Sequence, residues 1–110
     1  MNIQIFGKSK CFDTKKAERW FKERRVKFQA VDLKKQGMSL GELTSVKNAV
    51  GLEAMVDPKH PDAVLVSYLA SDQAKLEKLF DDPSHLRTPI VRNGKQAAVG
   101  YCPEVWERWG

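Results

Sequence analysis

The chain has 110 residues and a mass of 12.5 kDa, which is the size of one domain with one modest hydrophobic core. Its composition, with 42% apolar and 30% charged residues, is that of a globular protein and excludes a disordered chain. No apolar run reaches the roughly 18 residues of a membrane span, and the N-terminus lacks an apolar leader region, so we expect a single cytoplasmic domain over residues 1–110.

The net charge of +5 comes largely from lysines and arginines in residues 8–35. Such a surface attracts an anionic substrate or an acidic protein face. No base-reading motif, aromatic platform or arginine-rich tail accompanies the charge, so we do not expect direct nucleic-acid binding. A basic face that is merely solvated is the alternative.

The first predicted elements are a strand and a helix. Residues 2–6, NIQIF, alternate polar and apolar side chains and end at Gly7, which predicts a short strand and a turn. Residues 14–25 place apolar side chains three and four positions apart, which predicts a helix with one buried stripe. That stripe consists of Ala17, Trp20 and Phe21. Asp13 or Thr14 is the expected N-cap.

A second strand is predicted over residues 26–33, VKFQAVDL, with apolar alternation at Val26, Phe28 and Ala30. A strand, a helix and a strand in this order favour parallel pairing and a right-handed connection.

Next comes MSLGELTSVKNAVG, residues 38–51, in which Ser39 and Glu42 form a capping-box pattern and Gly51 closes a helix. The prolines of residues 57–62 then interrupt the chain. Residues 63–70 and 71–83 predict two further helical pieces. We therefore expect a helical insertion over about residues 38–82.

The C-terminal part predicts a hairpin and a closing helix. Asn93-Gly94 lies between two apolar runs in TPIVRNGKQAAVGY, which is a strong hairpin signal. Pro103 opens a short helix through Trp109. The whole order predicts an α/β, thioredoxin-like fold with a four-stranded mixed sheet flanked by helices and carrying a helical insertion.

Cys11 lies in the turn between the first strand and the first helix, where helix N–H groups and the dipole favour an anion. Lysines on both sides add positive charge, so we expect a lowered thiol pKa. These lysines are Lys8, Lys10, Lys15 and Lys16. In such a fold a proline at the position of Pro89 commonly follows a cis bond and lies beside this thiol. The alternative is a small buried cysteine that closes the turn.

Two segments, KCFDTKKAERWF and LRTPIVRNGKQAAVGYCPEVW, resemble the ArsC-type arsenate reductase family, which includes the Spx regulators. The resemblance covers essentially the whole chain. It implies a nucleophilic Cys11, arginines that hold the oxyanion, and glutathione with glutaredoxin as reductants. At the position just before Pro89, where the family resemblance implies an arginine, this chain has Thr88, and Arg87 lies one position earlier. The resemblance implies two further arginines, and at their positions this chain has Cys102 and, nearby, Lys59. These replacements make arsenate a doubtful natural substrate.

The Spx branch implies an alternative function, binding of the RNA polymerase α subunit or another acidic protein. Its redox switch needs a second cysteine in the tetrad that begins at Cys11, and here Thr14 stands at that place. The resemblance also places Cys102 near the nucleophile, where it would be a resolving thiol; a buried cysteine is the alternative.

The predicted site therefore contains Cys11 as nucleophile and Cys102 as a candidate resolving thiol. The predicted substrate-binding residues are Lys8, Lys10, Thr14, Arg87, Thr88 and Pro89. We expect no bound cofactor or metal, glutathione as co-substrate, and a monomer. His60 and His85 lack any repeated metal-ligand spacing and are predicted to be surface residues.

Overall fold

A four-stranded mixed sheet forms the centre of the computed structural model, which describes residues 1–109. The strands are β1 (Ile3–Gly7), β2 (Phe28–Asp32), β3 (Ile90–Asn93) and β4 (Gln96–Val99). Their order is β2-β1-β3-β4, with β1 parallel to β2 and antiparallel to β3, and with β3 antiparallel to β4. The predicted mixed sheet is confirmed.

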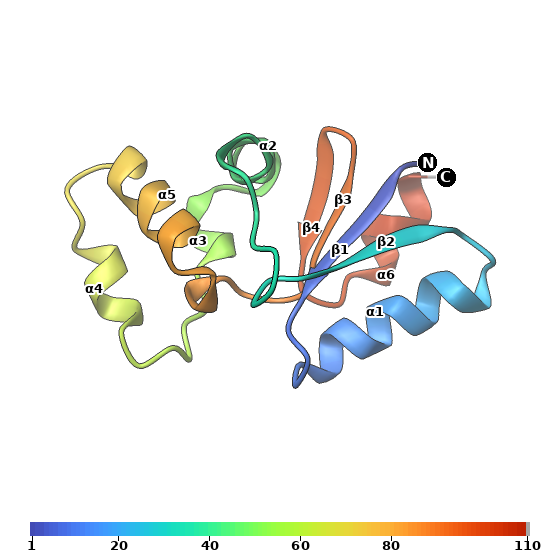
Figure 1. The fold of residues 1–110 in the computed structure, drawn as a ribbon. Coiled ribbons are helices and arrows are strands. Elements are labelled where there is room, and N and C mark those ends of the chain that lie inside the picture. The colour runs from blue at the N-terminus through green and yellow to red at the C-terminus, as the bar shows by residue number, and fades with distance from the viewer. Residues whose placement is uncertain (110) are drawn as a thin grey trace.

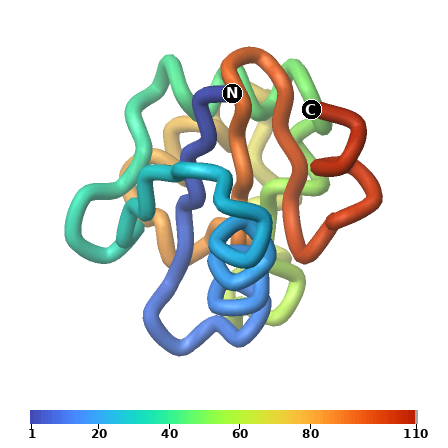
Figure 2. The backbone as a smooth tube through the Cα atoms, turned by 90° about the vertical axis from the view of Figure 1, so that its right-hand side faces the viewer, coloured from blue at the N-terminus to red at the C-terminus, as the bar shows by residue number. Residues whose placement is uncertain are grey.

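Helices cover both faces of this sheet (Figure 1). On one face lie α1 (Phe12–Glu23) and α6 (Pro103–Trp106). The other face carries the insertion between β2 and β3, which consists of α2 (Leu40–Val50), α3 (Leu52–Met55), α4 (Ala63–Ser67) and α5 (Asp72–Asp81). Figure 2 shows α1 and the C-terminal segment in front of the insertion. Two short 3-10 turns complete the chain, η1 (Pro83–His85) and η2 (Glu107–Trp109).

Alternating side chains of the central strands build two cores, one on each face. Ile3 and Ile5 of β1 join the α1 core, whereas Phe6 joins the insertion core. The α1 core contains Ile3, Ile5, Ala17, Trp20, Phe21, Val91, Ala98 and Trp106. The insertion core contains Phe6, Val31, Leu33, Met38, Leu43, Val46, Met55, Leu76, Leu79, Leu86 and Ile90. A strand with two buried faces suits the middle of a sheet between helical layers.

The start of α1 differs from the prediction. The helix begins at Phe12 and its N-cap residue is Cys11, so neither Asp13 nor Thr14 caps it. Thr14 is instead buried in the first turn. The predicted apolar stripe is confirmed, because its three members are all buried on the sheet.

In β2 the predicted apolar face is only partly correct. Val26 and Phe28 pack against the α1 core, but Ala30 is exposed and Val31 is buried in the insertion core. Because β2 is an edge strand that leads into the insertion, its deepest contacts lie on the face opposite α1.

The local signals of the insertion and the tail are confirmed. Ser39 and Glu42 form the predicted capping box of α2, which ends at Gly51 with a φ of 86°. Ser71 caps α5 by accepting the Ala74 amide hydrogen. The hairpin of β3 and β4 turns at Gly94, and α6 begins at Pro103. No helix among residues 1–109 has the length and apolar character to cross a membrane.

Candidate active site

The Cys11 thiol lies where the N-terminus of α1 meets the start of β3. Its Sγ donates a hydrogen bond to the Thr88 carbonyl oxygen over 3.6 Å, and the bond between Thr88 and Pro89 is cis. The two hydrogen-bonded residues are 77 positions apart in the sequence. The fold therefore brings together four of the predicted site residues, which are Cys11, Thr14, Thr88 and Pro89.

Thr14 lies one turn into α1 beside the thiol. Its Oγ1 is buried and has no hydrogen-bond partner among residues 1–109. Its side chain occupies the space where a Cβ on Gly7 would stand, so β1 needs glycine at its end. The free hydroxyl is a donor that an ionised sulfur can accept from.

The pKa of Cys11 is lowered by the donors around the sulfur. Burial alone raises the pKa of this thiol, but the nearby Thr14 and Thr88 hydroxyls, followed by the Thr14 and Asp13 backbone amides, favour the ionised sulfur and lower the pKa overall. These amides belong to the first turn of α1, so the N-terminal position of the cysteine has the predicted effect.

We expect Thr14→Val to raise the pKa of Cys11, because valine keeps the shape of threonine but removes the hydroxyl donor. Only the thiolate is alkylated, so the rate of reaction with iodoacetamide in a Cys102→Ser background should rise at a higher pH than in the parent. Thr14→Ser keeps the hydroxyl and should keep the low pKa. An unchanged profile in Thr14→Val would contradict this role.

Lys8 is engaged by backbone groups and an acidic side chain, and its predicted role in binding a substrate stays a prediction. Its Nζ donates to the carbonyl oxygens of Ser84 and Leu86 over 2.9 and 2.8 Å and lies 3.9 Å from Asp57. The lysine therefore ties the turn before Cys11 to the segment before β3. Lys10 is exposed and is free to meet an anion.

We expect Lys8→Met to destabilise the chain by about 1.5 to 3 kcal/mol, because two carbonyl oxygens lose a charged donor. Urea unfolding measures this change. Lys10→Met removes an exposed ammonium of the same turn and should stay within about 0.5 kcal/mol of the parent. Equal effects of the two substitutions would mean that the Lys8 hydrogen bonds contribute nothing.

Arg87 and Cys102 lie on the C-terminal side of the site. The Arg87 guanidinium lies beside Gly100, since a Cβ on that glycine would stand 3.5 Å from Nη2. Gly100 in turn donates its amide hydrogen to the Pro89 carbonyl oxygen over 2.8 Å. Burial, followed by the Glu104 charge, raises the pKa of Cys102, and the charge of Arg87 opposes this. Cys102 and Cys11 are both free thiols.

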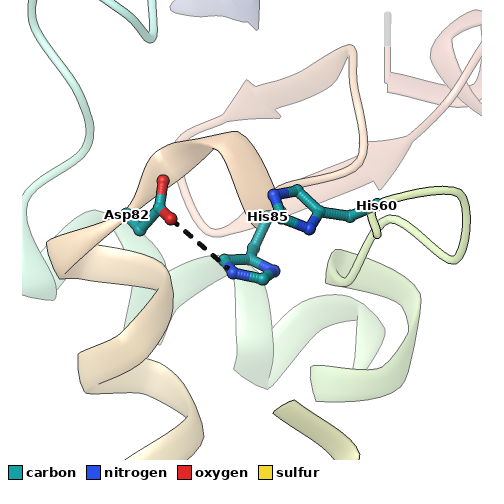
Figure 3. A group of neighbouring side chains, drawn as sticks. All are labelled: His60, Asp82 and His85. Carbon is teal, nitrogen blue, oxygen red and sulfur yellow. Dashed lines mark ion pairs between the residues drawn. The ribbon is translucent and has the colours of Figure 1, made fainter. Parts of the chain in front are cut away.

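The placement of the histidines differs most from the prediction. His85 is 1% exposed, which makes its predicted surface position wrong. Its ring stacks on that of His60 with centroids 3.8 Å apart, and its Nε2 faces Asp82 (Figure 3). The only sequence signal was the spacing of Asp82 and His85, three positions apart. The approach of His60 needs the folded insertion.

Known proteins resemble the chain along its whole length. No protein-family model matches it. It is 26% identical to the global transcriptional regulator Spx 2 of Oceanobacillus iheyensis, over 92% of this chain and 78% of that regulator. An arsenate reductase from Vibrio cholerae superposes with a TM-score of 0.84 and 22% identity, over 98% of this chain and 97% of that one. NrdH-redoxin, a glutaredoxin-like protein from Escherichia coli, superposes over 100% of this chain and 96% of its own, with a TM-score of 0.52 and 14% identity. These superpositions show a thioredoxin-like fold.

Proposed function

We propose that the chain, which is similar to an Spx regulator and shares the thioredoxin-like fold of arsenate reductases, is a thiol oxidoreductase in which Cys11 is the nucleophile and glutathione the reductant. The single observation that carries the proposal is the placement of the Cys11 thiol at the N-terminus of α1 against the Thr88 carbonyl oxygen, where the surrounding donors lower its pKa. A thiol in such a place is ionised more readily than an ordinary cysteine and attacks electrophilic sulfur faster.

The reaction that fits this site best is reduction of a mixed disulfide between glutathione and another thiol. The Cys11 thiolate attacks the glutathione sulfur, a bond forms between these two sulfurs, and the substrate leaves as a thiolate that takes a proton from water. A second glutathione thiolate then attacks the sulfur of the bound glutathione. Oxidised glutathione leaves and the Cys11 thiolate is restored, so that one disulfide is reduced and another formed.

The cations around the thiol favour a disulfide over arsenate. A tetrahedral oxyanion requires several converging donors of the bidentate arginine type. Here Thr88 and Cys102 stand at two of the positions where the family resemblance implies arginine, and Lys8 is engaged by backbone carbonyls. Arg87 and Lys10 supply charge for the carboxylates of glutathione.

The test is an assay coupled to glutathione reductase, in which NADPH consumption reports oxidised glutathione. We expect turnover with the mixed disulfide of glutathione and cysteine, and at most weak turnover with arsenate. A rate equal to the reaction without protein for both substrates would refute the proposal. Faster turnover with arsenate would refute the choice of substrate and keep the thiol chemistry.

A regulatory function is the second candidate, favoured by the similarity to an Spx regulator. In this alternative the lysines near Cys11 contact an acidic protein face, for which the RNA polymerase α subunit is the candidate partner. The tetrad that starts at Cys11 has no second cysteine, so such binding would not depend on reductant. Size-exclusion chromatography with the purified α subunit tests it; separate elution, with and without reductant, would exclude this partner.

A further inference from the structure

Away from Cys11, the cluster of His60, Asp82 and His85 contains a buried imidazole without adequate partners (Figure 3). His85 is almost fully buried, and its Nδ1 has no hydrogen-bond partner in the described chain. Its Nε2 faces Asp82 Oδ2 across 3.6 Å, which is too long for a hydrogen bond. Neither nitrogen of this buried ring therefore has a hydrogen bond within residues 1–109, which is costly, and Nε2, the nitrogen that faces the Asp82 carboxylate, is the one placed to bind an ion.

The distances between the ligand atoms of the three side chains suit the binding of one metal ion. One ligand atom from each lies within 4.8 Å of the others. Zinc is held at about 2.0 to 2.2 Å in a tetrahedron, which separates ligand atoms by about 3.3 to 3.6 Å. The 3.6 Å between Asp82 and His85 therefore accommodates an ion with little movement of either side chain. Two imidazoles and one carboxylate are also a known zinc ligand set that leaves a fourth position open.

His60 is the adjustable member of the cluster. Its Nδ1 accepts the Asp62 amide hydrogen over 3.0 Å, and its Nε2 lies 3.1 Å from Ser84 Oγ. The stacked imidazole planes differ by only 26°, so the lone pairs of the two rings do not converge on one point. His60 has to turn out of the stack to share an ion with His85. His60 is half-buried and lies in the loop between α3 and α4.

We propose that His60, Asp82 and His85 bind one zinc ion, with water in the fourth position. The ion would join the loop of His60 to η1, the turn that ends two residues before Arg87. It would thereby fix the segment that leads to Thr88 and Pro89 without taking part in the thiol chemistry.

The test is a titration of the protein with zinc, in which isothermal titration calorimetry measures the binding. The protein is first stripped with a chelator and carries Cys11→Ser and Cys102→Ser, because thiolates are strong zinc ligands themselves. We expect one zinc ion per chain. Removal of a residue that only hydrogen-bonds to a metal ligand typically lowers metal affinity by about tenfold or more. Removal of a ligand itself should cost at least as much, so His60→Ala and Asp82→Asn should each lower the zinc affinity by more than about tenfold.

The matched control is Asp81→Asn, which neutralises the neighbouring carboxylate outside the cluster and should leave the affinity unchanged. In NMR spectra, zinc should also shift the Asp62 amide signal, because rotation of the His60 side chain toward the ion breaks the hydrogen bond from this amide to His60 Nδ1. The proposal is overturned if the parent takes up no zinc, or if zinc binding is the same in the His60 and Asp82 variants as in the parent.

Discussion

Cys11→Ser is expected to lower glutathione-dependent turnover by more than about a thousandfold, the largest effect of any substitution in this chain. A serine hydroxyl at this place stays protonated near neutral pH, and it cannot form the mixed disulfide on which the reaction depends. The measurement is the coupled NADPH assay with the mixed disulfide of glutathione and cysteine. Unfolding curves should stay close to the parent, since the thiol is only half-buried.

Cys102→Ser is the matched control for this result. Burial and Glu104 raise the pKa of Cys102, so it is protonated near neutral pH and is a poor nucleophile. With glutathione present, this variant should keep most of the parent turnover. If its turnover falls as far as that of Cys11→Ser, Cys102 is the resolving thiol. Peptide mass mapping after mild peroxide should then find the two cysteines linked.

Phe21→Ala is expected to cost about 3 to 5 kcal/mol, which is a large part of the stability of a domain of this size. Phe21 is 1% exposed and its ring lies 4.9 Å from Trp20, 5.1 Å from Trp106 and 6.3 Å from Phe28, measured between centroids. Its removal leaves a cavity in the centre of the α1 core. Urea unfolding followed by circular dichroism measures the loss.

Phe12→Ala removes the same side chain from the same helix, but Phe12 is 79% exposed. This variant should stay within about 0.5 kcal/mol of the parent. A similar loss in both variants would mean that helix propensity, rather than packing in the α1 core, determines the stability of α1.

Most of the fold could be predicted because its signals are local. The capping box of Ser39, the Asn93-Gly94 turn and Pro103 each act on neighbouring backbone groups, so a few adjacent residues specify the element. The N-terminal position of Cys11 on α1 was predictable for the same reason. The face of β2 was not, because burial along an edge strand depends on which helices cover each side.

Local pattern therefore determined the order of elements, the two ends of α2, the start of α6 and the thiol at the N-terminus of α1. Only the tertiary structure decided how that thiol is surrounded and where the other polar groups are used. The Thr88 carbonyl that meets Cys11, the carbonyls that engage Lys8, and the ring that stacks on His85 all come from distant parts of the chain. Hydrogen bonds and burial act over a few ångströms of space, and a sequence pattern records such proximity only between near neighbours.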